Sequence, residues 1–157
     1  MSEIMQALYR GEDDEARKLA KNAELDVFEA AALGDATRLG QLLDADSKLA
    51  QARSDDDFTA LHYAAFFDGP ETALLLVEHV ADVNAFADND LGVHPLNSAA
   101  AARRPKVAAI LLEHGADPNA PTRGGFTPLD AARENGDEKL AELLRSHGGR
   151  DEPTTET

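Results

Sequence analysis

Five histidines are the first residues in this chain to suggest chemistry, because a neutral imidazole is a common metal ligand. Three of them, His79, His114 and His147, recur at intervals of 35 and 33 residues. This spacing places one histidine in each of three successive units. Packed helices lie about 8–10 Å apart, whereas zinc ligands all lie about 2 Å from one ion. We therefore expect no metal site, and we interpret these histidines as cation-capable groups near helix C-termini.

Other signs of a catalytic site are missing from the sequence. The chain has no cysteine, which excludes disulfides, thiolate zinc sites and a cysteine nucleophile. It contains no phosphate-binding glycine loop, nucleophile elbow or zinc-protease helix motif. Two acidic runs, at 12–15 and 55–57, lack the alternation and the final glutamate of a calcium loop. We expect no enzymatic activity and no cofactor.

The excess of acidic over basic residues limits the kinds of partner that we expect the chain to bind. Fifteen basic residues against thirty acidic ones give a formal net charge of -15. Nucleic acids and anionic membranes are bound through cationic contacts, so we expect neither as a partner. The sequence shows no signal peptide and no apolar run long enough to cross a bilayer, which predicts a cytoplasmic location. The use of ten arginines against five lysines fits a GC-rich bacterial genome.

The elements that carry these residues recur along the chain. Three segments align with almost no adjustment, at 58–65, 93–100 and 126–133. Their leucines Leu61, Leu96 and Leu129 are 35 and 33 residues apart, and a weaker copy places Val27 34 residues before Leu61. A period of this size indicates a repeat architecture, in which each unit buries its apolar face against its neighbours.

Each unit carries the signals of two short helices. Thr127 followed by Pro128 places a capping hydroxyl and then a proline at the first helical position, and both favour a helix start. Pro70 and Pro105 open the second helix of their units, in which apolar residues recur at helical spacing. Gly115 follows a second helix at the point where a left-handed residue is favourable.

The units resemble ankyrin repeats. The family pattern TPLHxAA followed by LLxxGADxN is matched best by TPL at 127–129, LHYAA at 61–65 and LLEHGADPN at 111–119. The resemblance implies an all-α solenoid of stacked helix-turn-helix units joined by β-hairpin loops. We expect degenerate capping helices at 1–24, a repeat stack at 25–149 and a flexible tail at 150–157. The units are expected near 25–57, 58–92, 93–125 and 126–149.

The sequence departs from the family pattern at some turns. Val80 stands where later units have glycine, and a β-branched residue in a left-handed backbone costs about 1–2 kcal/mol. Asp68 and Arg103 replace glycine between the two helices of their units.

His62 is interpreted as part of the turn that starts the first helix of its unit. Asn97 and Asp130 take its place in the next two units. An amide and a carboxylate offer different donors and acceptors from an imidazole. We therefore expect different hydrogen bonds at these three turns.

The resemblance also implies that the hairpin tips and the first helices form a concave face that contacts partner proteins. The family's variable positions, carried over to this chain, predict the following binding residues: Leu33, Asp55, Asp56, Phe58, Phe66, Phe67, Asp90, Leu91, Val93, Arg123, Phe126, Glu134 and Asn135.

Two interpretations of Phe66 and Phe67 are open. They are either aromatic anchors for a partner or side chains that cover the neighbouring hairpin. For Phe58 and Phe126, packing within the hairpin is the favoured interpretation. The acidic run 55–57 either steers a basic partner or keeps the surface soluble, and the second interpretation is favoured.

The main hypothesis is a non-enzymatic, monomeric module that binds an unidentified partner protein through the concave face. A first alternative is an acidic inhibitor or immunity-type protein that masks a basic target, and a steep loss of binding with added salt would distinguish it. A second alternative is a regulatory subunit or an enzyme with an unrecognised site. It would require a polar pocket with converging titratable groups.

Overall fold

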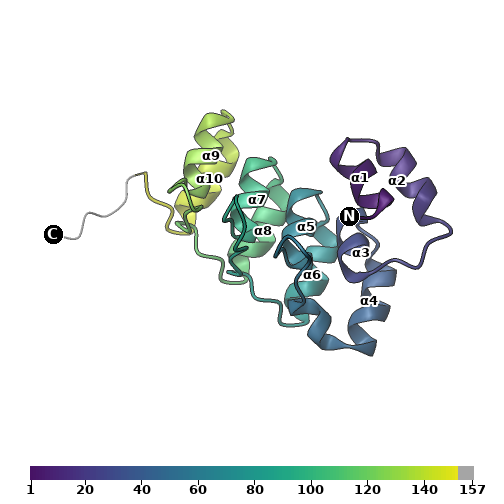
Figure 1. The fold of residues 1–157 in the computed structure, drawn as a ribbon. Coiled ribbons are helices and arrows are strands. Elements are labelled where there is room, and N and C mark those ends of the chain that lie inside the picture. The colour runs from purple at the N-terminus through teal and green to yellow at the C-terminus, as the bar shows by residue number, and fades with distance from the viewer. Residues whose placement is uncertain (152–157) are drawn as a thin grey trace.

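The computed structural model describes residues 1–151, so residues 152–157 of the expected flexible tail lie outside the described part. Within residues 1–151, ten α-helices and one short 3₁₀ helix follow one another along the chain. The helices form antiparallel pairs that follow one another in a row; the pairs from α3 to α10 stand side by side, whereas α1 and α2 pack at the N-terminal end at a different angle (Figure 1). None of the helices described in this range is both long and apolar enough to span a bilayer.

The row consists of five helix pairs. The first is α1 (Glu3–Tyr9) with α2 (Asp13–Ala20). The others are α3 (Val27–Leu33) with α4 (Ala36–Ala45), α5 (Ala60–Phe66) with α6 (Pro70–Glu78), α7 (Pro95–Ala101) with α8 (Pro105–Glu113), and α9 (Pro128–Glu134) with α10 (Glu138–Ser146). The 3₁₀ helix η1 (Ser47–Gln51) follows α4. From α3 onward, the first helices contact one another in order and so do the second helices, which confirms the expected all-α solenoid.

The helix starts follow the capping signals of the sequence. The Thr127 hydroxyl accepts the backbone N–H of Asp130 at 3.2 Å, and the Asp130 carboxylate accepts the N–H of Thr127 at 2.9 Å. Asp26 and Glu29 make the same reciprocal pair at the start of α3, at 2.8 and 2.9 Å. These bonds satisfy backbone N–H groups that have no partner within the helix.

The core lies between successive pairs and consists mainly of leucines and alanines. Leu61, Leu96 and Leu129 occupy equivalent places on α5, α7 and α9, and each is at most 1% exposed. Ala64 and Ala99 are completely buried beside them, and side chains this small let neighbouring helices approach closely. Each unit therefore hides its apolar face against the next unit, as the repeat pattern predicts.

A ladder of side-chain amides joins consecutive units. Each amide nitrogen donates to the carbonyl of the residue two positions after the next unit's second helix. The pairs are Gln51 with Val80 (3.1 Å), Asn84 with Gly115 (3.2 Å) and Asn119 with Gly148 (3.0 Å). Each of these bonds joins two adjacent units only.

The left-handed turns lie where the sequence predicts them. Val80 has φ 64°, and Asp68 and Arg103 both have φ 61°. Glycines take the same region at the equivalent positions, for example Gly115 with φ 93°. With Asp57 (φ 63°) in the first hairpin loop, four non-glycine residues of the described chain hold a backbone conformation that is unfavourable for side chains with a Cβ.

The loops between units are hairpins without regular strands. Within residues 1–151, the only β-type pairing is an isolated antiparallel bridge between Arg53 and Thr59. One backbone hydrogen bond closes each of three tips: Ser54 N to Phe58 O (2.9 Å), Ala87 N to Val93 O (2.9 Å) and Thr122 N to Phe126 O (2.7 Å). We call residues 54–58, 87–93 and 122–126 the hairpin tips.

Candidate partner-binding groove

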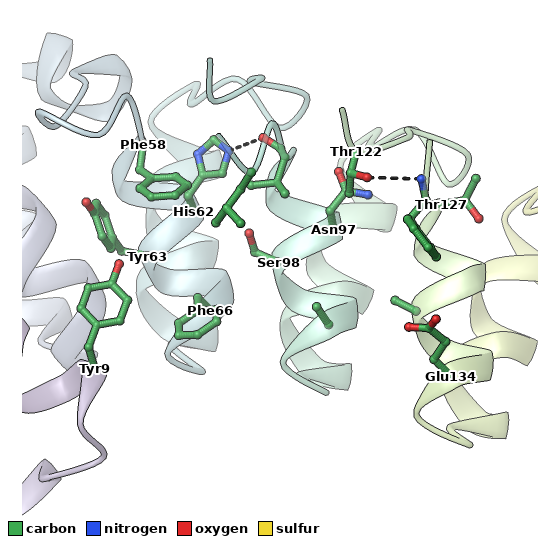
Figure 2. A pocket seen from close by; sticks show the side chains of 15 residues that line it. Tyr9, Phe58, His62, Tyr63, Phe66, Asn97, Ser98, Thr122, Thr127 and Glu134 are labelled. Atoms are coloured by element: carbon green, nitrogen blue, oxygen red, sulfur yellow. Dashed lines mark hydrogen bonds between the residues drawn. The ribbon is translucent and has the colours of Figure 1, made fainter. Parts of the chain in front are cut away.

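The face of the stack formed by the first helices and the hairpin tips is hollowed into a groove of about 510 Å³. Its floor comes from α5, α7 and α9, one side comes from the tips, and α1 contributes at the N-terminal end (Figure 2). The groove therefore runs across three consecutive units.

Aromatic rings form the N-terminal end of the groove. Tyr63 and Phe66 come from α5, Phe58 comes from the first tip and Tyr9 is the last residue of α1. The ring centroids of Phe58 and Tyr63 are 5.6 Å apart, and those of Tyr9 and Phe66 are 6.0 Å apart. Ring pairs at these separations attract one another. Phe66 is still 41% exposed, so part of this aromatic wall faces solvent.

The side chains that form the floor are large on α5 and small on α7. Ser98 and Ala101 on α7 stand 35 positions after Tyr63 and Phe66, at equivalent places of the repeat. Both line the groove, together with Glu134 on α9. Replacement of two large rings by a hydroxymethyl and a methyl group leaves space above α7, which accounts for the hollow beside the aromatic wall.

The tips form the side of the groove. Leu91 is 64% exposed and Phe126 is 52% exposed, whereas Val93 is half-buried. The side-chain oxygen of Asn89 accepts the N–H of Leu91 at 3.0 Å, and its amide nitrogen donates to the carbonyl of Asp56 at 2.7 Å. The exposed Leu91 is therefore carried on a tip that is fixed to the tip before it.

Neutral polar groups support the groove from below. The backbone N–H of Thr59 donates to Nδ1 of His62 at 3.1 Å, so Nε2 carries the proton and donates to the carbonyl of Val93 at 3.0 Å. Burial lowers the pKa of His62 to about 4, which keeps the ring neutral. Asn97 instead donates to the carbonyl of Ala120 at 2.8 Å. At all three turns, however, the same capping bond forms, since the backbone N–H of Thr59, His94 and Thr127 donates to the side chain three residues later. The expected difference is therefore found in the bond to the next unit and not in the cap.

Two arginines at the hairpin tips form ion pairs within the molecule: Arg53, just before the first tip, and Arg123 in the third. Arg53 pairs with Asp57 at 3.1 Å. Arg123 pairs with Asp88 at 2.6 Å, and its guanidinium carbon lies 5.5 Å from the ring centroid of Phe86. Their positive charges are offset by carboxylates of the same molecule.

Four carboxylates at the edge of the groove, which we call the rim carboxylates, form no ion pair with an arginine of the described chain. Asp55, Asp56, Asp90 and Glu134 are exposed, and no ion pair to them is found in the part of the chain that the structure describes. Burial raises the pKa of Tyr9 to about 12, and the charge of Asp56 contributes to this rise. The negative field of Asp56 therefore reaches the aromatic end of the groove.

The structure brings together six of the predicted binding residues in the groove lining: Phe58, Phe66, Leu91, Val93, Phe126 and Glu134. Leu33 and Phe67 line a smaller hollow of about 320 Å³ between α1 and the stack. Asp55, Asp56, Asp90, Arg123 and Asn135 are outside the groove lining. Of these, Asn135 lies at the end of α9 and donates to the carbonyl of Ala101 at 3.3 Å.

Phe66 and Phe67 differ in exposure, although their ring centroids are 4.9 Å apart and both line the smaller hollow. Phe66 lines the groove, whereas Phe67 is half-buried against the core, with its ring centroid 5.1 Å from that of Tyr9. The two other phenylalanines also differ. Phe58 packs against the core as expected, but the expected hairpin packing does not describe Phe126, half of whose surface is exposed.

Some residues that line the groove are not among the predicted binding residues. Tyr9 lies in the expected capping segment, and Tyr63 lies in the repeat motif. Comparison of Tyr63 with Ser98 and Ala131, which share its position in the repeat, was the available signal for a change in the floor. Nothing in the sequence indicated that Tyr9 reaches the groove.

The three histidines that recur in the units form hydrogen bonds at the C-terminal ends of the second helices. Because a carbonyl oxygen can only accept, Nδ1 of each ring carries a proton and donates to the carbonyl four residues earlier. The pairs are His79 with Leu75 (2.9 Å), His114 with Ile110 (2.8 Å) and His147 with Leu143 (3.0 Å). This geometry agrees with their interpretation as groups at helix C-termini. Among residues 1–151, no cluster of three or more histidine, cysteine or acidic side chains has the arrangement to hold a metal ion.

Comparison with known families agrees with the geometry. A family model described as ankyrin repeats, in three copies, matches residues 27–122, which is more than half of the chain. The chain therefore belongs to the ankyrin-repeat family. A search of curated proteins gives no match. Ankyrin repeats are generic modules of protein-protein interaction and are typically non-enzymatic scaffolds.

Proposed function

We propose that this chain is a non-enzymatic module that binds a partner protein through the groove. The observation that carries the proposal is a hollow of about 510 Å³ lined mainly by apolar and aromatic side chains, several of them exposed. Contiguous exposed apolar surface with a polar rim marks interaction sites in soluble proteins. Burial of that surface by a partner supplies the driving force for binding.

The rigidity of the tips supports this function. Arg53 donates to the carbonyl of Phe86 at 2.7 Å, which links the first tip to the loop that leads into the second. The backbone N–H of Arg123 donates to the carbonyl of Gly92 at 2.8 Å, which links the second tip to the third. A surface that is already ordered loses little conformational entropy when a partner binds.

Two polar groups at the aromatic end of the groove have structural roles. Both ring nitrogens of His62 are used in hydrogen bonds, and the Tyr63 hydroxyl donates to Ser54 at 2.9 Å. A general base needs a nitrogen or oxygen available to the substrate. These contacts make His62 unavailable as a general base.

Site-specific photocrosslinking tests the proposal. A photoreactive phenylalanine analogue at Leu91, on the groove rim, is expected to form a covalent adduct with a protein in lysate of the source organism. The matched control carries the same analogue at Leu74, an exposed apolar residue of α6. Leu74 lines a shallow hollow between α4 and α6 and is not part of the groove lining. The same adducts from both positions, or none from Leu91, would contradict the proposal.

A further inference from the structure

The groove has one place shaped for a large side chain. Above α7 the floor is made by Ser98 and Ala101, with Tyr63 and Phe66 at the equivalent places on α5, Ala131 and Glu134 at those on α9, and Phe126 on the tip that leads into α9. Figure 2 shows Ser98 on the middle helix, between the rings of α5 and the residues of α9. An apolar side chain placed there contacts the aromatic rings of α5 on one flank and displaces water from apolar surface.

The rim around this place is negative. Asp55 and Asp56 lie on the first tip, Asp90 on the second and Glu134 at the end of α9, and the nearest tip arginines already pair with other carboxylates. The whole chain has a formal net charge of -15. A partner with basic side chains next to its apolar anchor is favoured by this field, and an acidic partner is disfavoured.

We infer that the groove binds a peptide segment of the partner protein in which one bulky apolar side chain fills the space over Ser98 and Ala101. Lysine or arginine residues adjacent to that side chain contact the rim carboxylates, Asp56 at one end and Glu134 at the other. This inference rests on the proposed function and adds the chemistry of the partner. The anchor provides most of the affinity, and the basic residues provide orientation and steering.

Peptide selection with a filled-groove variant tests the inference. The purified full chain is the bait for a library of random peptides of about 12 residues, since an extended residue spans about 3.3–3.6 Å and such peptides can cross the groove. Enriched peptides are synthesised, and their dissociation constants are measured by fluorescence anisotropy. We expect enriched sequences to share an aromatic or leucine-sized residue next to lysine or arginine.

Ala101→Phe is the decisive variant. It restores the ring that Phe66 provides at the equivalent place of the preceding unit, so the fold accommodates it while the hollow is filled. We expect it to weaken binding of the selected peptides by at least about 30-fold, the scale of a lost hot spot. Ala102→Phe is the matched control, because Phe67 stands at the equivalent place and Ala102 is not part of the groove lining. It should leave the dissociation constants within about threefold, the scatter tolerated for positions outside a hot spot.

The charge of the rim has its own test. The double variant Asp56→Asn, Glu134→Gln keeps the size of both side chains and removes two negative charges. We expect it to weaken peptides with basic residues by about tenfold, and to leave peptides of the same apolar anchor with neutral flanks nearly unchanged. Thermal unfolding of all variants shows that they remain folded.

The outcomes separate the inference from the function on which it rests. Equal binding of the peptides to wild type and Ala101→Phe, enrichment of peptides without the apolar and basic pair, or no enrichment at all would each overturn the inference. Crosslinking at Leu91 does not depend on any of these results. An adduct there combined with a failed selection would retain the groove as a protein-binding site and reject the peptide as its occupant.

Discussion

The imidazole of His62 donates a hydrogen bond from Nε2 to the main-chain carbonyl of Val93, 3.0 Å away and in the next unit of the stack. The same ring accepts the backbone N–H of Thr59 through Nδ1 at 3.1 Å. Only the neutral ring can do both, because a protonated imidazole has two donors and no acceptor. Protonation therefore leaves the Nε2 donor to Val93 in place and breaks the link from the Thr59 N–H to Nδ1, at the start of α5.

This link predicts a pH-dependent stability. The pKa of His62 is about 4 in the folded protein and 6.5 in the free group, so the unfolded chain binds the proton more tightly. The contribution of His62 is complete above pH 6.5 and is lost as the pH falls from 6.5 to 4, by about 3 kcal/mol. Urea denaturation at a series of pH values measures the loss. His62→Gln is the control, and parallel pH profiles for wild type and variant in this range would contradict the prediction.

The strained turn at Val80 predicts a stabilising substitution. Val80 has φ 64° and is 76% exposed, so its side chain adds little packing in return for the unfavourable backbone. Val80→Gly is expected to gain about 1 kcal/mol, because relief of the strain exceeds the entropy lost by glycine, and to raise Tm by about 2–4 °C. Calorimetry measures the change. Val83→Gly, at a backbone position with negative φ, should lower Tm, and a lower Tm for Val80→Gly would show that the turn is not strained.

Thr72 tests the contact between the second and third helix pairs. Its buried hydroxyl donates to the carbonyl of Ala31 at 3.0 Å. Thr72→Val keeps the shape but removes this hydrogen bond, while the Ala31 carbonyl keeps the longer bond from the N–H of Gly34 (3.3 Å), and the free energy of unfolding is expected to fall by about 1 kcal/mol. The exposed Thr37 on α4 offers the same substitution as a control, which should change stability by less than about 0.5 kcal/mol. Similar losses at both positions would contradict the role of the hydrogen bond.

Phe66 and Phe67 are expected to respond differently to truncation. Phe67→Ala removes a ring that packs on Tyr9 and the core, so we expect it to destabilise the fold by about 2–3 kcal/mol. Phe66→Ala removes an exposed ring of the groove, and it should weaken the selected peptides by at least about tenfold with a smaller loss of stability. Denaturation and fluorescence anisotropy measure the two effects. If both variants changed the same quantity, the two residues would not have separate roles.

The response to salt distinguishes an apolar anchor from charge mimicry. Binding through the hollow over α7 is expected to lose less than about tenfold in affinity between low and physiological salt, because the rim charges are exposed and screened while the apolar contact persists. An acidic inhibitor that masks a basic target mainly by charge would lose affinity much more steeply. Anisotropy titrations of the selected peptides over a range of NaCl concentrations measure the slope.

The repeat phase was sufficient to predict the helices and the core. The positions of Leu61, Leu96 and Leu129 follow from the period alone, because each repeat buries the same face. The left-handed turn at Val80 also follows, since it shares a position with glycines that adopt positive φ. These features depend on local sequence and on repetition.

The groove was predicted only in part. Phe66 and Phe67 share a residue type, but Phe66 ends α5 and lines the groove, whereas Phe67 follows the helix and packs on Tyr9 and the core, a difference that the sequence does not show. The position of Tyr9 depends on how α1 packs against α3, and the repeat period carries no information about a segment outside the repeats. The hollow over Ser98 results from a contrast between units rather than from any motif.

The amide ladder limits how far a local opening can spread. Because each rung joins only neighbouring pairs, release of α9 and α10 breaks the bond between Asn119 and Gly148 and leaves the earlier rungs closed. When these two helices detach, Phe126 and Glu134 leave the groove, whereas the rings of Tyr9 and Phe66 stay in place. A bound segment would then be held at one end only, so its escape could proceed in stages from the C-terminal side without unfolding of the remaining stack.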